Sequence, residues 1–518
     1  MADDSGDLAR LLLSTSSSTP IGMKQKHALG YADSFAAELA IERGAPGSSR
    51  PDPEFQKVGK ALYIRCRGMR NSAGLPGAGP SITPIAVLDL AQLFPPRAEN
   101  SSKLPARLSP ERTKIMSFAK LTQAVLLLLV GSTLVPSGWA QTYTVLYTFE
   151  GGTDGAYPFA GLIRDSAGNL YGSTIGANVG GLEGSVFKLS LGKFKLLHSF
   201  KYGGAGGARP GGLVRDSAGN LYGTTAGWGT SPATIFKLTK YGVFSVLHTF
   251  TGGAGGSSPL GPLVLDPAGN LYGATGSGGS PTCGGGFGCG VVFKLDTSGN
   301  ETVLHTFLWG KRGTYPNGGL IRDAAGNLYG TTSSGGYNLH GTVFKLDPAG
   351  NETVLYAFKG EPDGSQPNGE LIQDAAGNFY GTTLWGGTGK CQSRNCGVVF
   401  KLDTNGNETL LHSFSGGADG GNPVAGLVMD SARNLYGTTV TGGAPGCLYY
   451  ACGVVFKLDQ SGKETVLYTF VPGGTTGFSP EAGVIRDSAG NLYGTASLGG
   501  DVPDCQVGGC GVVFKITP

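Results

Sequence analysis

Residues 161–174 read GLIRDSAGNLYGST, and close copies of this stretch recur through the chain. A fixed period of a few tens of residues is typical of propeller blades and solenoid units. The asparagine of the stretch recurs at intervals of 50 to 57 residues, at Asn169, Asn220, Asn270, Asn327, Asn378, Asn434 and Asn491. The fold is therefore expected to consist of one supersecondary unit present in seven copies.

Each period contains four strand-like pieces. In the fourth copy they are residues 319–322 (GLIR), 327–332 (NLYGTT), 342–346 (TVFKL) and 352–358 (ETVLYAF). All are short and rich in β-branched and aromatic residues, and the D-x-A-G-N segments between the first two and the last two are hairpin turn signals. The sequence predicts an all-β fold, a seven-bladed β-propeller of four-stranded antiparallel blades.

The ends of the repeat array predict how the ring closes. The last copy stops at Pro518 without its fourth strand, whereas a spare fourth strand begins at Tyr143 and ends at Phe149. Closure removes the exposed edges that a single long sheet would leave. We therefore predict that this N-terminal strand completes the last blade.

A secretion signal precedes the repeats. A basic segment around Met116 is followed by an apolar run at residues 124–135, and small residues occupy the −3 and −1 positions of a cut after Ala140. The apolar run is too short to span a bilayer comfortably. The alternative is an uncleaved membrane anchor with a cytoplasmic N-terminal segment.

These features predict an exported protein, secreted or periplasmic, with no membrane span in the mature chain. The expected segments are a non-native or disordered upstream extension at residues 1–115, a signal peptide at 116–140 and the propeller at 141–518.

Length variation is concentrated in the loop between the second and third strands, which covers 14 to 21 residues from the Tyr before it to the Phe after it. In a meander this loop shares a face with the link to the next blade, and variable loops on one face are typical of binding sites. Each of the four longest loops contains a cysteine pair, which predicts disulfides in an exported chain. Zinc ligation is the alternative, but no histidine accompanies the pairs. The pairs are Cys283 with Cys289, Cys391 with Cys396, Cys447 with Cys452, and Cys505 with Cys510.

Residues suited to acid–base chemistry are scarce. Four of the six histidines share one fourth-strand position with tyrosines of other copies, which favours packing, since a phenol could not replace an acid–base histidine freely. The aspartates of the D-x-x-G-N turns are expected to cap those turns, and no familiar catalytic or metal motif is present. We expect no catalytic residue, no metal ligand and no cofactor.

The candidates for ligand contact are aromatic, histidine and arginine residues of the variable loops, whose rings suit stacking on sugars or peptides. The alternative is that they cover the backbone of their own loops. They are Trp228, Tyr337, His340, Trp385, Arg394, Tyr449 and Tyr450.

The elements GLIRDAAGNLYGTT (319–332) and GVVFKLD (397–403) resemble the Gloeobacter/Verrucomicrobia-type tandem repeat of exported bacterial proteins in the choice-of-anchor group. The resemblance covers residues 142–518 and implies a β-propeller. Members of that group often end in a sorting segment, whereas this chain ends at Ile516-Thr517-Pro518, which favours release or periplasmic residence. More distantly, D-x-x-G-N-L-Y resembles turns of NHL-type propellers.

We predict a monomeric, non-catalytic binding or scaffold protein that engages a glycan, a peptide or a cell-surface partner through the variable loop face. A net charge of +3 with interspersed signs argues against nucleic acid as the partner. The alternative is an extracellular lyase or hydrolase that acts on polysaccharide at a site near the central channel.

Overall fold

The structure is a computed structural model. It describes residues 141–176, 182–391, 395–444, 452–473, 475–500, 502, 505 and 508–518. The predicted extension and signal peptide, residues 1–140, lie outside the described residues.

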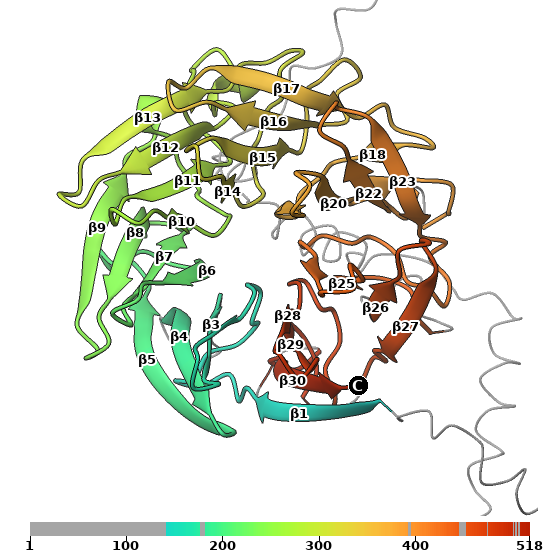
Figure 1. Ribbon diagram of the computed structural model, residues 1–518. Helices are drawn as coiled ribbons and strands as arrows, with labels where there is room; N and C mark the ends of the chain where they lie inside the picture. Colours follow the sequence, from blue (N-terminus) through green and yellow to red (C-terminus); the bar gives the residue numbers. More distant parts are fainter. Residues whose placement is uncertain are drawn as a thin grey trace, which may run out of the picture. The chain divides into compact units, whose positions relative to one another are not determined.

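Seven four-stranded antiparallel sheets form the blades. One additional two-stranded sheet joins the link before blade 5 to the loop after the second strand of that blade. Figure 1 shows the blades arranged around a central axis, with the first strand of each blade innermost and the fourth outermost. The predicted all-β, seven-bladed propeller is confirmed.

The strand bounds follow the repeat closely. Blade 1 contains β2 (Ile163–Arg164), β3 (Leu170–Thr174), β4 (Leu182–Ser190) and β5 (Lys193–Lys201). Blade 2 contains β6 (Pro210–Arg215), β7 (Leu221–Thr225), β8 (Ala233–Leu238) and β9 (Phe244–Phe250). Blade 3 contains β10 (Val264–Leu265), β11 (Leu271–Thr275), β12 (Val291–Leu295) and β13 (Glu301–Thr306). Blade 4 contains β14 (Ile321–Arg322), β15 (Leu328–Thr332), β16 (Thr342–Leu346) and β17 (Glu352–Ala357).

Blade 5 contains β19 (Ile372–Gln373), β20 (Phe379–Thr383), β22 (Val398–Leu402) and β23 (Glu408–Ser413). Blade 6 contains β24 (Val428–Met429), β25 (Leu435–Thr439), β26 (Val454–Leu458) and β27 (Glu464–Thr469). Blade 7 contains β28 (Ile485–Arg486), β29 (Leu492–Ala496), β30 (Val512–Thr517) and β1 (Thr142–Thr148). The two-stranded sheet pairs β18 (Gly364–Ser365) with β21 (Trp385–Gly386), and two short 3₁₀ segments are η2 (Gly253–Gly255) and η3 (Gly284–Gly286).

In blade 7, the outermost strand comes from the N-terminal side of the repeats. β1 pairs antiparallel with β30, from Thr142 opposite Thr517 to Thr148 opposite Val512. The Tyr143 ring stacks on Tyr468 of blade 6, with the ring centroids 3.8 Å apart. This strand therefore takes the place of the fourth strand that the last repeat lacks (Figure 1).

The core of a blade forms where the second strand faces the third. In blade 4, Gly330 of β15 is opposite Phe344 of β16, and the Phe344 ring is fully buried. A Cβ atom on Gly330 would come within 2.8 Å of that ring. The glycine of each L-Y-G segment is therefore required because the third-strand ring occupies the space of its side chain.

The aspartates cap the hairpin turns, as predicted. Asp323 Oδ1 accepts the Asn327 backbone N–H at 2.8 Å, and Oδ2 accepts the Asn327 side-chain amide at 2.7 Å and the Tyr329 hydroxyl at 3.0 Å. Burial acts to raise the pKa of Asp323, but these hydrogen bonds outweigh it and hold the pKa below its ordinary value. The turn is thus tied to the first residues of the second strand.

Hydroxyl groups of the second strands join neighbouring blades near the axis. Thr382 Oγ1 donates to the Ala425 carbonyl of the next blade at 2.8 Å, and Thr438 Oγ1 donates to the Ala482 carbonyl at 3.0 Å. These bonds satisfy backbone carbonyls that lie just before the innermost strands of the next blade.

The shared His/Tyr position of the fourth strand lies at the outer seam between blades. His198 stacks on Phe244 of the next blade with the ring centroids 3.8 Å apart. In another seam, His305 Nε2 is 3.4 Å from Glu352 Oε2. The predicted packing role of this position is confirmed, because each ring contacts the start of the next outer strand.

Candidate functional site

The loops between second and third strands and the links between blades form one face. The Thr314 N–H, in the link to blade 4, donates to the Ser334 carbonyl in the loop of that blade at 2.8 Å. The next residue, Tyr315, donates its N–H to the Cys289 carbonyl of blade 3 at 2.9 Å. A link is therefore bonded to the loops on both of its sides, which makes the variable loops neighbours around the ring.

Disulfides lie at these loop junctions. The structure joins Cys283 with Cys289, Cys391 with Cys396 and Cys505 with Cys510, with Cα atoms 5.4, 5.0 and 5.4 Å apart. Cys452 is disulfide-bonded, and Cys447 lies outside the described residues.

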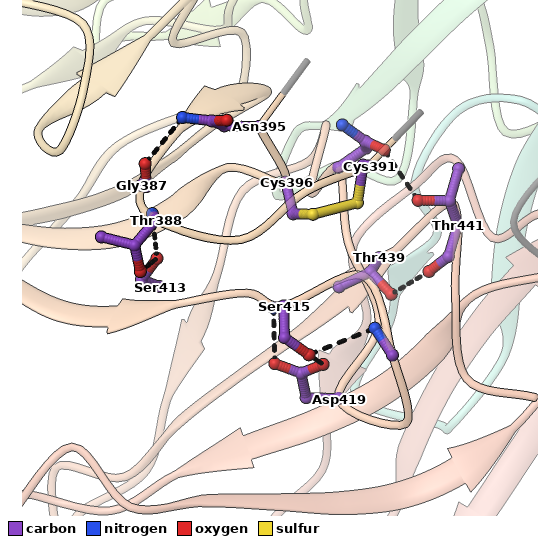
Figure 2. The surroundings of a disulfide bond; sticks show 12 residues. Gly387, Thr388, Cys391, Asn395, Cys396, Ser413, Ser415, Asp419, Thr439 and Thr441 are labelled. Carbon is purple, nitrogen blue, oxygen red and sulfur yellow. Dashed lines mark hydrogen bonds between the residues drawn. A yellow bond between two sulfur atoms is a disulfide. The ribbon is translucent and has the colours of Figure 1, made fainter. Parts of the chain in front are cut away.

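The Cys391–Cys396 disulfide packs on the neighbouring blade. Figure 2 shows it beside Thr439 and Thr441 of blade 6. A Cβ atom on Gly421, in the link to blade 6, would lie 2.6 Å from Cys391 Sγ. The disulfide thus belongs to the contact between two blades as well as to its own loop.

His340 occupies, in the short loop of blade 4, the position that the second cysteine holds in the long loops. Its carbonyl accepts the Gln366 N–H at 2.8 Å, and its ring Nδ1 lies 2.8 Å from the Ser365 hydroxyl. This predicted ligand residue is therefore held in the contact between blades 4 and 5. Beside it, Trp385 of β21 is half-buried and pairs with Ser365.

Two other predicted ligand residues are described, Trp228 in the loop of blade 2 and Tyr337 in the loop of blade 4. Trp228 is half-buried under the Arg209 guanidinium, which is 3.6 Å from the ring centroid. Tyr337 is exposed over 74% of its surface. Arg394, Tyr449 and Tyr450 lie outside the described residues.

An exposed patch with two aromatic rings includes Tyr337, and only Tyr337 among its members was predicted as a ligand residue. Its members are the side chains of Leu308, Trp309, Lys311, Tyr337 and Leu339, here named the Trp309 patch. Trp309 belongs to a link between blades, whereas only the loops between strands were expected to bear ligand contacts. The available signal was the pair Leu308-Trp309 directly after the fourth-strand Phe, since these links are otherwise rich in glycine.

Two further candidate residues, Glu370 and Glu481, precede the first strands of blades 5 and 7. Glu370 precedes the first strand of blade 5, at the position that Gly319 holds in blade 4 and Gly426 in blade 6. A Cβ atom on Gly319 would lie 3.2 Å from the Glu370 carboxyl carbon, and one on Gly426 would lie 3.3 Å from the Glu370 Cβ. The side chain is thus held between its neighbours, and burial raises the pKa of Glu370 to about 7.

Glu481 lies in the link that precedes the first strand of blade 7. Its Oε1 accepts the Ser479 hydroxyl at 3.2 Å and the Ser497 hydroxyl at 3.4 Å. Burial raises the pKa of Glu481 to about 7 against the opposing effect of these hydrogen bonds. Neither carboxylate was predicted, because the residues just before the first strands vary between copies and form no recognisable catalytic motif.

Within the described ranges, no three or more His, Cys, Asp or Glu side chains come together as metal ligands. The described part of the chain also contains no helix that is long and apolar enough to cross a bilayer.

The fold and the repeat define a tandem-repeat β-propeller. The family model of the Gloeobacter/Verrucomicrobia repeat matches residues 134–287 and 321–518, and the chain belongs to this family. A comparison with curated proteins finds no match.

Several solved structures resemble this chain at low sequence identity and with TM-scores below 0.5. A gluconolactonase from Xanthomonas campestris is 16% identical with a TM-score of 0.35, over 57% of this chain and 86% of that one. The extracellular domain assigned to a hybrid two-component system of B. thetaiotaomicron is 12% identical with a TM-score of 0.46, over 72% of this chain and 39% of that one. A luciferin-regenerating enzyme is 13% identical with a TM-score of 0.37, over 73% of this chain and 95% of that one.

Proposed function

We propose that the protein is an exported binding or scaffold propeller that engages a glycan, a peptide or a cell-surface partner through its loop face. The proposal rests mainly on one observation: the variable loops, the disulfides and the exposed rings of Trp309 and Tyr337 all occur on one face of an otherwise uniform repeat. Uniform blades need no such rings for stability, since their own cores are filled by buried phenylalanines.

Export is supported by two features. Disulfides persist in oxidising compartments outside the cytosol, and the segment from Met116 to Ala140 has the parts of a cleavable signal. N-terminal sequencing of exported material should find Gln141 as the first residue. A mature chain that retains residues before Met116 would contradict this part of the proposal.

The binding role is tested by probing glycan and peptide arrays and intact cell surfaces with the whole chain. The expected result is binding that weakens when loop-face rings are replaced, as in Trp228→Ala or Tyr337→Ala. The matched control is Tyr241→Ala, because Tyr241 is 84% exposed in a turn between the third and fourth strands, on the opposite face. Equal weakening by this control, or no binding at all, would count against the loop face.

A second function, hydrolysis or lysis of polysaccharide, is favoured by the carboxyl groups of Glu370 and Glu481. A carboxyl group with a pKa near 7 can serve as a general acid or base at neutral pH. Both Glu370 and Glu481 have a pKa raised by burial to about 7. The test is turnover on a panel of polysaccharides. Loss of turnover in Glu370→Gln or Glu481→Gln would establish the acid–base role of that residue. Turnover that persists in both variants would exclude both residues from catalysis.

A further inference from the structure

We propose that the Trp309 patch binds an anionic polysaccharide, one whose sugars carry carboxylate or sulfate groups. The inference deepens the proposed loop-face function and rests on it. It assigns a particular place on that face and a chemical class of ligand.

The patch is a continuous surface built from two segments. The link after β13 provides Leu308, Trp309 and Lys311, and the loop after β15 provides Tyr337 and Leu339. The Gly336 N–H donates to the Gly310 carbonyl at 3.2 Å, which holds the two segments side by side. The aromatic and basic side chains therefore present themselves together.

The rings of the patch take no part in the blade core. Trp309 is 57% exposed and Tyr337 is 74% exposed, and the flanking Leu308 and Leu339 are 57% and 49% exposed. By contrast Phe307, directly before the patch, is fully buried. Clustered exposed apolar side chains on a soluble protein are typical of an interaction site.

One cation, Lys311, lies beside the Tyr337 ring, and a second, Arg312, follows it directly in the chain. The Lys311 ammonium lies 4.8 Å from the Tyr337 ring centroid. Arg312 Nη1 lies 3.7 Å from Glu352 Oε2, while the Arg312 side chain remains 70% exposed and the Glu352 side chain is fully buried. The arginine is thus held by Glu352 while most of its side chain remains accessible to a ligand. Because the Glu352 side chain is buried, its negative charge is not exposed to repel an anion.

This combination fits an acidic sugar better than other ligands. A sugar ring offers an apolar C–H face that can stack on Trp309 or Tyr337, and a carboxylate or sulfate at its rim can reach Lys311 and Arg312. A neutral glycan would leave both cations unused. Single-stranded nucleic acid would use rings and cations, but it needs a basic groove along its backbone, and the chain has a net charge of only +3.

The test measures binding of the whole chain to polygalacturonate and to heparin by titration calorimetry. Neutral dextran, poly-glutamate and oligo-dT are the comparison ligands. Wild type should bind the acidic polysaccharides, less tightly as salt increases. Trp309→Ala and Tyr337→Ala should each weaken binding about tenfold, the value of one lost stacking contact, and Lys311→Gln should reduce the salt dependence.

The matched controls are Tyr241→Ala and Lys240→Gln. This pair reproduces the cation over an exposed tyrosine, with the Lys240 ammonium 5.2 Å from the Tyr241 centroid, on the opposite face. Controls that weaken binding as much as the patch variants would overturn the proposal, as would equal binding of dextran, poly-glutamate or oligo-dT. Unchanged thermal unfolding of the surface variants shows that lost binding is not lost folding.

The outcomes separate this inference from the loop-face function. If the arrays reveal a ligand whose binding weakens in Trp228→Ala but is unchanged in the patch variants Trp309→Ala, Tyr337→Ala and Lys311→Gln, the patch assignment fails while the loop-face function stands. If no array ligand and no acidic polysaccharide binds wild type, both fail.

Discussion

Replacing Glu370 with glutamine should stabilise the protein at alkaline pH. Its carboxyl group lies beside Gly319, while Gly426 faces its Cβ and backbone, and burial raises its pKa from the ordinary value of 4.5 to about 7. Because one pH unit of pKa change corresponds to 1.36 kcal/mol, the ionised side chain costs the fold at most about 3 kcal/mol. The side chain is only half-buried, so the cost falls below this bound.

The sign of the effect follows from proton binding. A carboxyl group with a raised pKa favours the folded state fully below its unfolded-state pKa, and this contribution is lost as the pH rises from about 4.5 to about 7. Glu370→Gln keeps the shape and cannot ionise. It should therefore match wild type near pH 4 and exceed it in stability by about 1 to 3 kcal/mol near pH 8.

Urea unfolding at both pH values, with disulfides intact, measures this difference. Glu361→Gln is the control, because Glu361 is an exposed glutamate of the adjoining link. A Glu370→Gln variant that is less stable than wild type at pH 8, or that differs equally at both pH values, would refute the reasoning. It would show that the carboxylate is stabilised by a partner rather than penalised by burial.

Three further predictions concern the scaffold. Gly330→Ala should destabilise by about 1 to 3 kcal/mol through overpacking, while Gly161→Ala, where a Cβ meets nothing within 4 Å, should change urea unfolding little. Asp323→Asn should cost about 2 kcal/mol at pH 7 by weakening its charge-assisted bonds, and the difference should shrink as the pH falls below about 4, in unfolding measured across pH. Joint replacement of Cys391 and Cys396 by serine should lower the stability by about 2 kcal/mol, and reductant should then lower the thermal unfolding temperature less than it does in wild type.

The sequence predicted the scaffold well because the scaffold depends on local chemistry. Asp323 caps its turn through residues four and six positions further on, so the motif contains its own explanation. The seven-fold repeat then fixes the architecture, since a short meander buries its faces only against other copies. The role of the fourth-strand histidines could also be predicted, because tyrosine replaces them in other blades.

The candidate sites could be predicted only in part, because they depend on contacts between segments of different blades. Tyr337 was expected as a ligand residue from its loop, but its neighbour Trp309 lies in a link to the same blade. His340 was expected in the same role, yet its ring is engaged by Ser365 of blade 5. In both cases the contacting residues are about 25 positions apart in the sequence, and nothing in the repeat pattern indicates that they meet.

The search for function in such a protein is best directed at single-blade departures from the repeat. A residue present in all copies is explained by the blade itself, as Gly330 is by the ring of Phe344. A residue that departs from its column at a cost in stability needs another reason to be there. Glu370 brings an ionisable group to a position that glycine fills in both neighbouring blades, and Trp309 exposes an indole that the blade core does not need. Burial of Glu370 lowers the stability of the fold at neutral pH and above, and the exposed Trp309 ring adds nothing to the blade core, so both positions are where ligand contacts should be sought first.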